Sequence, residues 1–306
     1  MKQNFTTFFE EMSQVLFFRN IYFGIAFLTL SIIFSPHLFG CGLFAALIGY
    51  WYEKINRTPK ILKDGGLLSI NGFFFGIAMA SLFKESTQFY LCLAIGAFAV
   101  PLATKAAFEI LQHWKLSPYI ISYIFVVWVF FLSAKAFSFE FQNHTEFLKN
   151  SIFFLDDSYQ LNTVFRIILS IFTSMGLLFF LPDPAYGFGL LILISLFSPR
   201  MGIFFLLGTA LATLAVFFLS VNLPINSDLS QYCYSAGLVG LGLASWPEKF
   251  NYKTIFLFCL LSLFLTLAAD QMLKNLNLPM LSIPYVMTIW VALLSRVPRL
   301  NVSWAQ

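Results

Sequence analysis

The stretch GLLSINGFFFGIAMASL, residues 66–82, decides how this chain folds. It carries no charged side chain, and as a helix it would be barely long enough to cross a bilayer core of about 30 Å. Asn71 and Gly72 interrupt its apolar run. Polar groups and irregular backbone are tolerated at membrane depth only where protein buries them or a polar cavity lies beside them. The stretch therefore predicts a helical element that lines a pathway.

Composition places the whole chain in the membrane class. Of its 306 residues, 59% are hydrophobic and 10% are charged, with 40 Phe and a mean hydropathy of +0.82. A soluble domain is about 25% charged. The apolar runs are long and continuous, whereas a transmembrane barrel would alternate apolar and polar residues. We therefore expect an all-α polytopic protein of the inner (plasma) membrane, with the lipid bilayer and no nucleic acid as its partner.

The second half of the chain repeats the first. Without gaps, Gln14–Pro36 aligns with Leu177–Pro199, and seven of 23 positions are identical, including a shared Phe-Ser-Pro at the end. At nearly the same offset, Asn71-Gly72 aligns with Ser235-Ala236. A nearly constant offset over separated blocks indicates duplication. We expect a first repeat over residues 1–136, a connector over 137–160 and a second repeat over 161–306.

The loops indicate that the two halves are inverted. Four basic residues precede the stretch 66–82: Lys54, Arg57, Lys60 and Lys63. The corresponding loop of the second half, Ser220–Gln231, has none and carries Asp228. Because basic loops stay in the cytoplasm, the first loop is predicted inside and the second outside, with both termini cytoplasmic and the connector external. Inverted repeats place a substrate site near the membrane midplane, around a central pore between the halves.

The chain shows no enzymatic or metal-binding pattern. It contains no paired-carboxylate site, no phosphate-binding loop and no Ser/His/Asp arrangement within one structural unit. Its four cysteines have neither metal-ligand nor disulfide spacing, and we expect them to be small buried residues: Cys41, Cys92, Cys233 and Cys259. We therefore expect no catalytic activity, no metal and no cofactor.

At three places the chain resembles the urea transporter family. The first pore segment of that family typically reads Gln-Val-x-Phe, followed by Asn and Gly, and here residues 14–17 are QVLF with Asn20 and Gly24. Its second element is near Gly-Leu-x-Gly-Phe-Asn-Gly-x-Leu-x-Gly, which stands here as GLLSINGFFFG at 66–76. Its signature Leu-Pro-x-x-Thr-x-Pro-Phe stands at 278–285 as LPMLSIPY. The resemblance runs from about Gln14 to Trp290.

This resemblance implies ten spanning helices plus tilted or re-entrant half-helices, and a homotrimer with one pore in each protomer. It also implies passive, channel-like conduction of urea through aromatic slots and a ladder of oxygen atoms. By matching position, the slot residues are Phe17, Ile70, Phe180 and Tyr234. Other residues predicted to line the pore are Gln14, Asn71, Leu177, Ser235 and Ser282. Urea is flat and neutral, with one acceptor and four N–H donors, so flat apolar walls and a row of acceptors suit it.

Departures from the family pattern keep other functions open. Ile70 stands where the family usually has an aromatic residue, and Leu177 stands where it generally has Glu. The signature is also degenerate in the first half, at Leu116–Tyr123. A channel of the same fold with altered selectivity, for ammonia or another small amide, is therefore an alternative. An ion-coupled secondary transporter is a third hypothesis, weakened by the scarcity of intramembrane carboxylates.

Overall fold

Helices form the regular structure of this chain. The computed structural model describes residues 2–56, 58–134, 136, 140–141, 163–219 and 227–295. Within these ranges the only strand-like pairing is an isolated antiparallel bridge between Phe83 and Phe141. The predicted all-α class is confirmed. Most of the predicted connector, the loop residues 220–226 and the C-terminal residues 296–306 lie outside the described residues.

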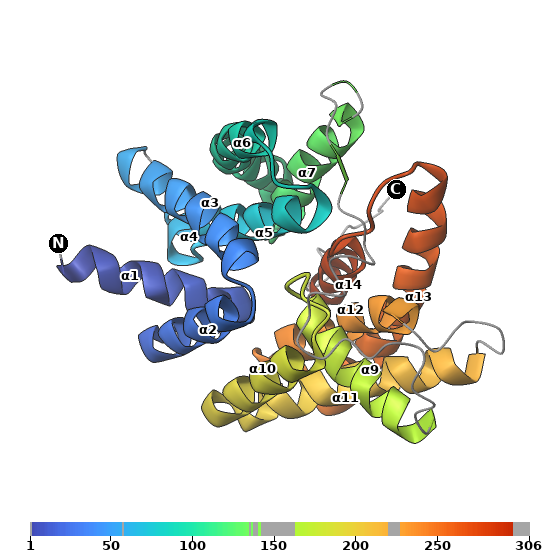
Figure 1. Cartoon of the computed structure of the whole chain (residues 1–306). Coiled ribbons are helices and arrows are strands. Elements are labelled where there is room, and N and C mark those ends of the chain that lie inside the picture. The colour runs from blue at the N-terminus through green and yellow to red at the C-terminus, as the bar shows by residue number, and fades with distance from the viewer. Residues whose placement is uncertain are drawn as a thin grey trace, which may run out of the picture.

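The helices fall into two groups that follow the order of the chain. The first group is α1 (Lys2–Ser13), η1 (Gln14–Leu16), α2 (Ile21–Phe34), α3 (Pro36–Ile55), α4 (Lys60–Asp64), α5 (Leu67–Leu82), α6 (Thr87–Leu111), η2 (Gln112–Trp114) and α7 (Ile121–Ser133). The second group is α9 (Thr163–Leu177), α10 (Pro184–Phe197), α11 (Pro199–Leu219), α12 (Ser227–Ala244), α13 (Tyr252–Asn275) and α14 (Ile283–Leu294). Figure 1 shows the blue-to-green helices beside the yellow-to-red ones. The groups meet where α2 packs against α10 and α7 against α14.

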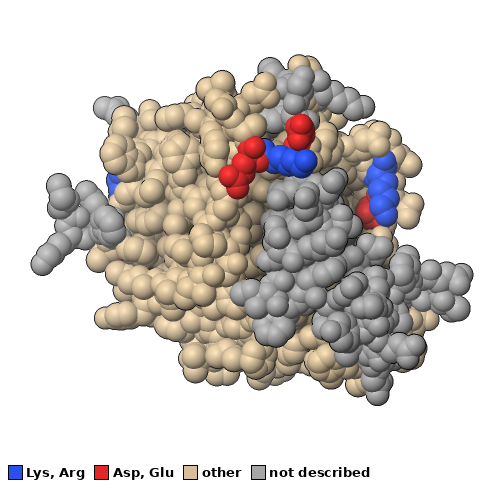
Figure 2. All heavy atoms as spheres, in the orientation of Figure 1, with Lys and Arg blue, Asp and Glu red and all other residues tan. Residues whose placement is uncertain are grey.

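Several helices are suited to a membrane. In the described part of the chain, α6, α11 and α13 are each long and apolar enough to cross one, and α1 with α2 would form a fourth span bent by 72°. Shorter apolar helices of 10–17 residues accompany them, α5, α7, α10 and α14 among them. The face of the molecule in Figure 2 shows few charged side chains, all in its upper part. These features agree with a membrane protein, and ten spans stay a prediction.

Local signals set where α2 and α10 begin. The Asn20 carboxamide oxygen accepts hydrogen bonds from the backbone N–H groups of Tyr22 and Phe23, at 2.8 and 3.2 Å. The Asp183 carboxylate accepts the same pair of bonds at the start of α10. Three residues before each capping residue stands a phenylalanine with a left-handed backbone, Phe17 (φ 65°) or Phe180 (φ 59°). This backbone conformation ends the preceding helix. The matched breaks lie 163 residues apart, at the offset of the sequence alignment.

Glycines let the backbones of neighbouring helices touch. A Cβ atom added to Gly24 would lie 2.1 Å from the carbonyl oxygen of Phe9, so α2 presses against α1 there. A Cβ atom on Gly187 would lie 1.9 Å from the carbonyl oxygen of Phe172, where α10 presses against α9. Small residues at such crossings are how membrane helices approach closely.

Gly187→Ala is expected to destabilise the protein. The added methyl group meets backbone rather than a flexible side chain, so α9 and α10 must separate, at a cost of about 1–3 kcal/mol or more. Thermal unfolding of the purified protein measures this effect. Gly40→Ala is the matched control, because nothing lies within 4 Å of its added Cβ atom. An equal loss of stability in both variants would contradict the close contact.

Three elements differ from their sequence-based bounds. From the sequence we predict a long helix over 89–114 that is broken at Pro101, but α6 continues through Pro101. For residues 164–181 we predict a horizontal piece that leads into a tilted half-helix, but α9 is one continuous element, Thr163–Leu177. We also predict a span from Leu116 to Ala136, but α7 begins at Ile121, because the backbone of Tyr119 is left-handed (φ 45°) and interrupts helical geometry.

The two groups of helices exchange a pair of hydrogen bonds. The indole N–H of Trp128 on α7 donates to the carbonyl oxygen of Pro279, at 2.9 Å. The indole N–H of Trp290 on α14 donates to the carbonyl oxygen of Ser117, at 3.0 Å. Each indole thus reaches across to the turn before the other helix. The two bonds therefore help to fix the position of one group of helices relative to the other.

Candidate functional site

A cavity of about 400 Å³ lies between the two groups of helices, and we call it the vestibule. Its lining includes Gln14, Phe17, Ile70 and Phe74 from the first group and Leu238 and Tyr285 from the second. Among the described residues that line it, one is charged: Arg19, which is exposed. A cavity with walls from both halves is where a molecule passing between them would be held.

The break between α1 and α2 places two predicted residues at the vestibule. Gln14 opens the short turn η1, and Phe17 closes it with its left-handed backbone. The ring centroid of Phe17 lies 6.5 Å from that of Tyr285, with 53° between the planes. Because a Cβ atom on Gly242 would come within 3.2 Å of the Phe17 ring, α12 passes close to it. Phe17 therefore points toward the second group of helices.

Phe74 is a vestibule residue that the sequence did not single out. Its ring is 3% exposed and stacks on Tyr123, at 5.4 Å and 20°, and on Phe179, at 5.9 Å and 5°. Phe179 belongs to the second group, so Phe74 bridges the halves. One signal pointed to it: Phe74 stands four residues after Ile70, on the same face of α5.

Asn71 holds the backbone together beside the vestibule. Its amide donates to the carbonyl oxygens of Leu67, at 2.9 Å, and Tyr119, at 2.7 Å. Its carbonyl oxygen accepts from the backbone N–H of Tyr123, at 3.1 Å. Both N–H donors are thus used within the protein. Asn71 ties α5 to the turn before α7 and does not line the vestibule.

The predicted second-half slot residues lie away from the vestibule. Leu177 ends α9 and Phe180 lies on the turn that follows; both are half-buried, and the Phe180 N–H donates to the Leu177 carbonyl oxygen at 3.0 Å. Tyr234 is buried, and its hydroxyl donates to the carbonyl oxygen of Leu281. Of the four predicted slot residues, the structure brings only Phe17 and Ile70 into this cavity.

The two predicted serines are engaged in contacts within the protein. The hydroxyl of Ser235 pairs with that of Ser262 at 2.8 Å, between α12 and α13. The hydroxyl of Ser282 accepts from the Tyr123 hydroxyl at 3.0 Å, which joins α7 to the start of α14. These oxygens hold the helices around the vestibule in place.

Comparison with known proteins identifies what this arrangement belongs to. A family model described as urea transporter matches residues 5–297. The chain belongs to the urea transporter family. This family consists of transport proteins rather than enzymes, and membership supports urea as the substrate. A search of curated protein sequences finds no match.

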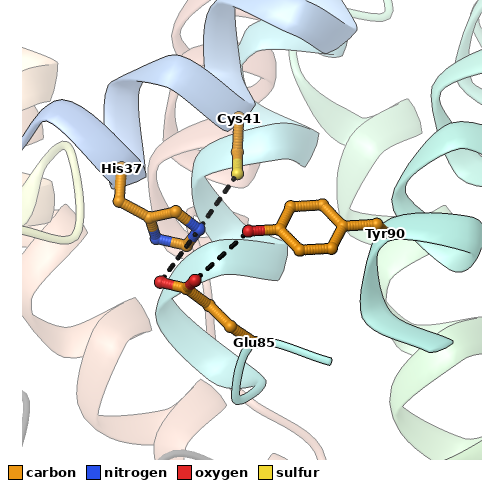
Figure 3. A network of polar contacts seen from close by, with 4 residues as sticks. All are labelled: His37, Cys41, Glu85 and Tyr90. Carbon is orange, nitrogen blue, oxygen red and sulfur yellow. Dashed lines mark hydrogen bonds and ion pairs between the residues drawn. The ribbon is translucent and has the colours of Figure 1, made fainter. Parts of the chain in front are cut away.

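A second polar cluster of this urea transporter family member lies at the start of α3 (Figure 3). The Nε2 atom of His37 lies 3.6 Å from the Cys41 sulfur and 3.3 Å from a carboxylate oxygen of Glu85, and Tyr90 donates to the other oxygen at 3.2 Å. A thiol–imidazole–carboxylate relay needs both ring nitrogens, and here a single nitrogen faces both groups. The described residues contain no group of three metal-ligating side chains suited to a metal ion. The contacts of this cluster therefore join α3 to the turn before α6.

Proposed function

We propose that this protein is a passive, channel-like pore for urea and that the vestibule is one entrance of the pore. The observation that carries the proposal is the placement of Gln14, Phe17 and Ile70 on one cavity between the two halves. The flat ring of Phe17 and the apolar side chain of Ile70 supply narrow walls. The amide of Gln14 supplies both an acceptor and donors for a neutral amide solute.

The pathway continues from the vestibule past Phe74 to the second half. An uncharged, narrow pore resists ions, because stripping an ion of its water without replacing the lost ligands costs far more than dehydrating a neutral amide. Phe180, Tyr234 and Leu177 then belong to the opposite entrance. In this scheme Asn71, Ser235 and Ser282 shape the pathway by holding its helices.

The proposal includes two inverted repeats, ten spanning segments and a homotrimer in the plasma membrane with both termini cytoplasmic. Support for the repeats comes from features that recur at offsets of 162 or 163 residues. These are the capping pair Asn20 and Asp183, the left-handed pair Phe17 and Phe180, and the reciprocal bonds of Trp128 and Trp290. The trimer rests on family membership alone.

Stopped-flow shrinkage of proteoliposomes in a urea gradient tests the function. Reconstituted protein is expected to give a urea flux well above that of empty liposomes. Equal fluxes would refute the proposal. Imposed proton or sodium gradients are expected to drive no uphill accumulation of urea, and accumulation would establish an ion-coupled transporter instead.

The second candidate function is a channel of altered selectivity for ammonia or another small amide. Ile70 favours this second function, because it lines the vestibule with an aliphatic side chain at a position where an aromatic slot would present a ring. Competition among urea, formamide and ammonia on the same liposomes separates the two functions. Stronger competition by another solute than by urea would assign that solute.

Leu177→Glu is expected to shift selectivity toward urea. The half-buried Leu177 offers no hydrogen bond, whereas a carboxylate would accept from two N–H groups of urea. A hydrogen bond to a charged group is worth about 1.5–3 kcal/mol, so urea should gain roughly tenfold over ammonia in the competition assay. Leu177→Met is the control, since it keeps size and apolarity. Identical selectivity in both variants would remove Leu177 from the pathway.

A further inference from the structure

Two buried carboxyl groups lie beside the vestibule without the partners that such groups need. Glu11 on α1 is 3% exposed and Glu53 near the end of α3 is 2% exposed. One carboxyl oxygen of Glu11 accepts from the Ser69 hydroxyl. Among the described residues, its other oxygen and both oxygens of Glu53 are buried without a hydrogen-bond partner. Three unpartnered carboxyl oxygens in one buried region are unusual in a folded protein.

The surroundings do not neutralise these groups. The two carboxyl groups repel each other, and Asp64 on α4 adds repulsion on Glu53. Lys54 on α3 and Lys63 on α4 attract both, but neither forms an ion pair with them in the described residues. The ammonium group of Lys54 instead lies 4.8 Å from the ring centre of Tyr50, the remaining titratable neighbour.

We propose that Glu11 and Glu53 form a proton-binding site that controls the vestibule. An unpaired carboxylate is costly to bury, whereas the protonated acid is neutral. The protonated acid also has an O–H donor, which a carboxylate lacks. A proton is therefore the ligand that this site takes. With protons bound, α1, α3 and α5 pack as they do here. Ionisation places two negative charges in the same region and drives these helices apart.

The site is linked to the vestibule through short segments. Glu11 lies three residues before Gln14 on the same α1–η1 segment. It also packs on the turn before α5, since a Cβ atom on the left-handed Gly66 would lie 2.9 Å from the Glu11 side chain. The neighbours Gly65 and Leu67 line the vestibule. Displacement of Glu11 therefore moves two parts of the vestibule lining: Gln14 on one side, and Gly65 and Leu67 at the start of α5 on the other.

Thermal unfolding as a function of pH tests the proton site without any solute. A group kept neutral in the fold but ionised in the unfolded chain stabilises the fold most at low pH, and that advantage falls as pH rises. The unfolding temperature of the natural protein is expected to fall by roughly 5 °C between about pH 4.5 and pH 7, and to change little above that. Glu53→Gln is expected to reduce this fall, and the double variant Glu11→Gln with Glu53→Gln is expected to abolish it. The control is Glu85→Gln, whose side chain is 58% exposed and which should follow the natural protein.

An unchanged pH slope in the double variant, or an equal loss of slope in Glu85→Gln, would overturn the proposal. Should Glu53→Gln not fold, Glu11→Gln provides the same comparison. The second readout, which rests on the proposed function, is urea flux. It should fall severalfold as pH rises, and the double variant should make it independent of pH. A natural protein with the pH slope of unfolding but no urea flux at any pH would refute urea transport and leave the proton site standing.

Discussion

Replacing Phe74 by Leu is expected to raise the urea permeability of proteoliposomes about tenfold. The Phe74 ring stands at the vestibule and stacks on Tyr123 and Phe179. On the proposed pathway, a solute that continues inward has to displace this ring from both partners. Aromatic pairs contribute about 0.5–1.5 kcal/mol each beyond burial, so two pairs add roughly 1–3 kcal/mol to the barrier. Removing about 1.4 kcal/mol of barrier corresponds to a factor of about ten in rate.

Phe75→Leu is the matched control for this prediction. It makes the same change one residue later on α5, where the ring is fully buried against Phe130 and away from the vestibule. Stopped-flow light scattering on both variants, normalised to the amount of reconstituted protein, gives the comparison. A rise in Phe75→Leu with none in Phe74→Leu would place the pathway elsewhere.

Replacing Asn71 by Ala is expected to destabilise the protein by about 2–5 kcal/mol. The change leaves the carbonyl oxygen of Tyr119 and the N–H of Tyr123 without their side-chain partner in a buried turn. Each unsatisfied buried backbone group costs about 1–3 kcal/mol. Leu67 loses less, because its carbonyl oxygen keeps its helical bond. Unfolding of the purified protein in mild detergent measures the loss.

Ser235→Ala provides the comparison in the second half. Ser235 aligns with Asn71, but its hydroxyl makes one side-chain bond, to Ser262. Its replacement is expected to cost about 1 kcal/mol. Equal destabilisation by the two variants would mean that Asn71 does not hold the turn before α7.

Local features of this fold were predictable from the sequence. The sequence predicts a span at Ile21–Phe34 that ends at Ser35-Pro36, and α2 has these bounds, because Asn20 caps its start and Ser35-Pro36 follows its end. The all-helical class followed from long apolar runs, and the family from motifs that extend across the chain. The signals that set the ends of a helix, capping oxygens and the geometry of proline, act within a few residues. They can therefore be read from the local sequence.

Side-chain roles in the middle of the fold depended on tertiary structure. The opening stretch is buried on every side as α5, from Leu68 to Ser81, so no amphipathic face tells which side chains meet the vestibule. Only the packing of α7 shows that the Asn71 side chain makes its hydrogen bonds to the Tyr119–Tyr123 turn. Only the position of the second half shows that Phe74 stacks on Phe179 and so connects the two halves.

The sequence by itself determined the all-helical class, the break between α1 and α2, the membrane class and the family of this protein. The tertiary structure decided which residues surround the vestibule and brought Glu11 near Glu53, residues 42 positions apart in the chain. The reason is physical. Helix bounds arise from hydrogen bonds within one or two turns, whereas the contents of a cavity arise from the contact of helices that are distant in sequence.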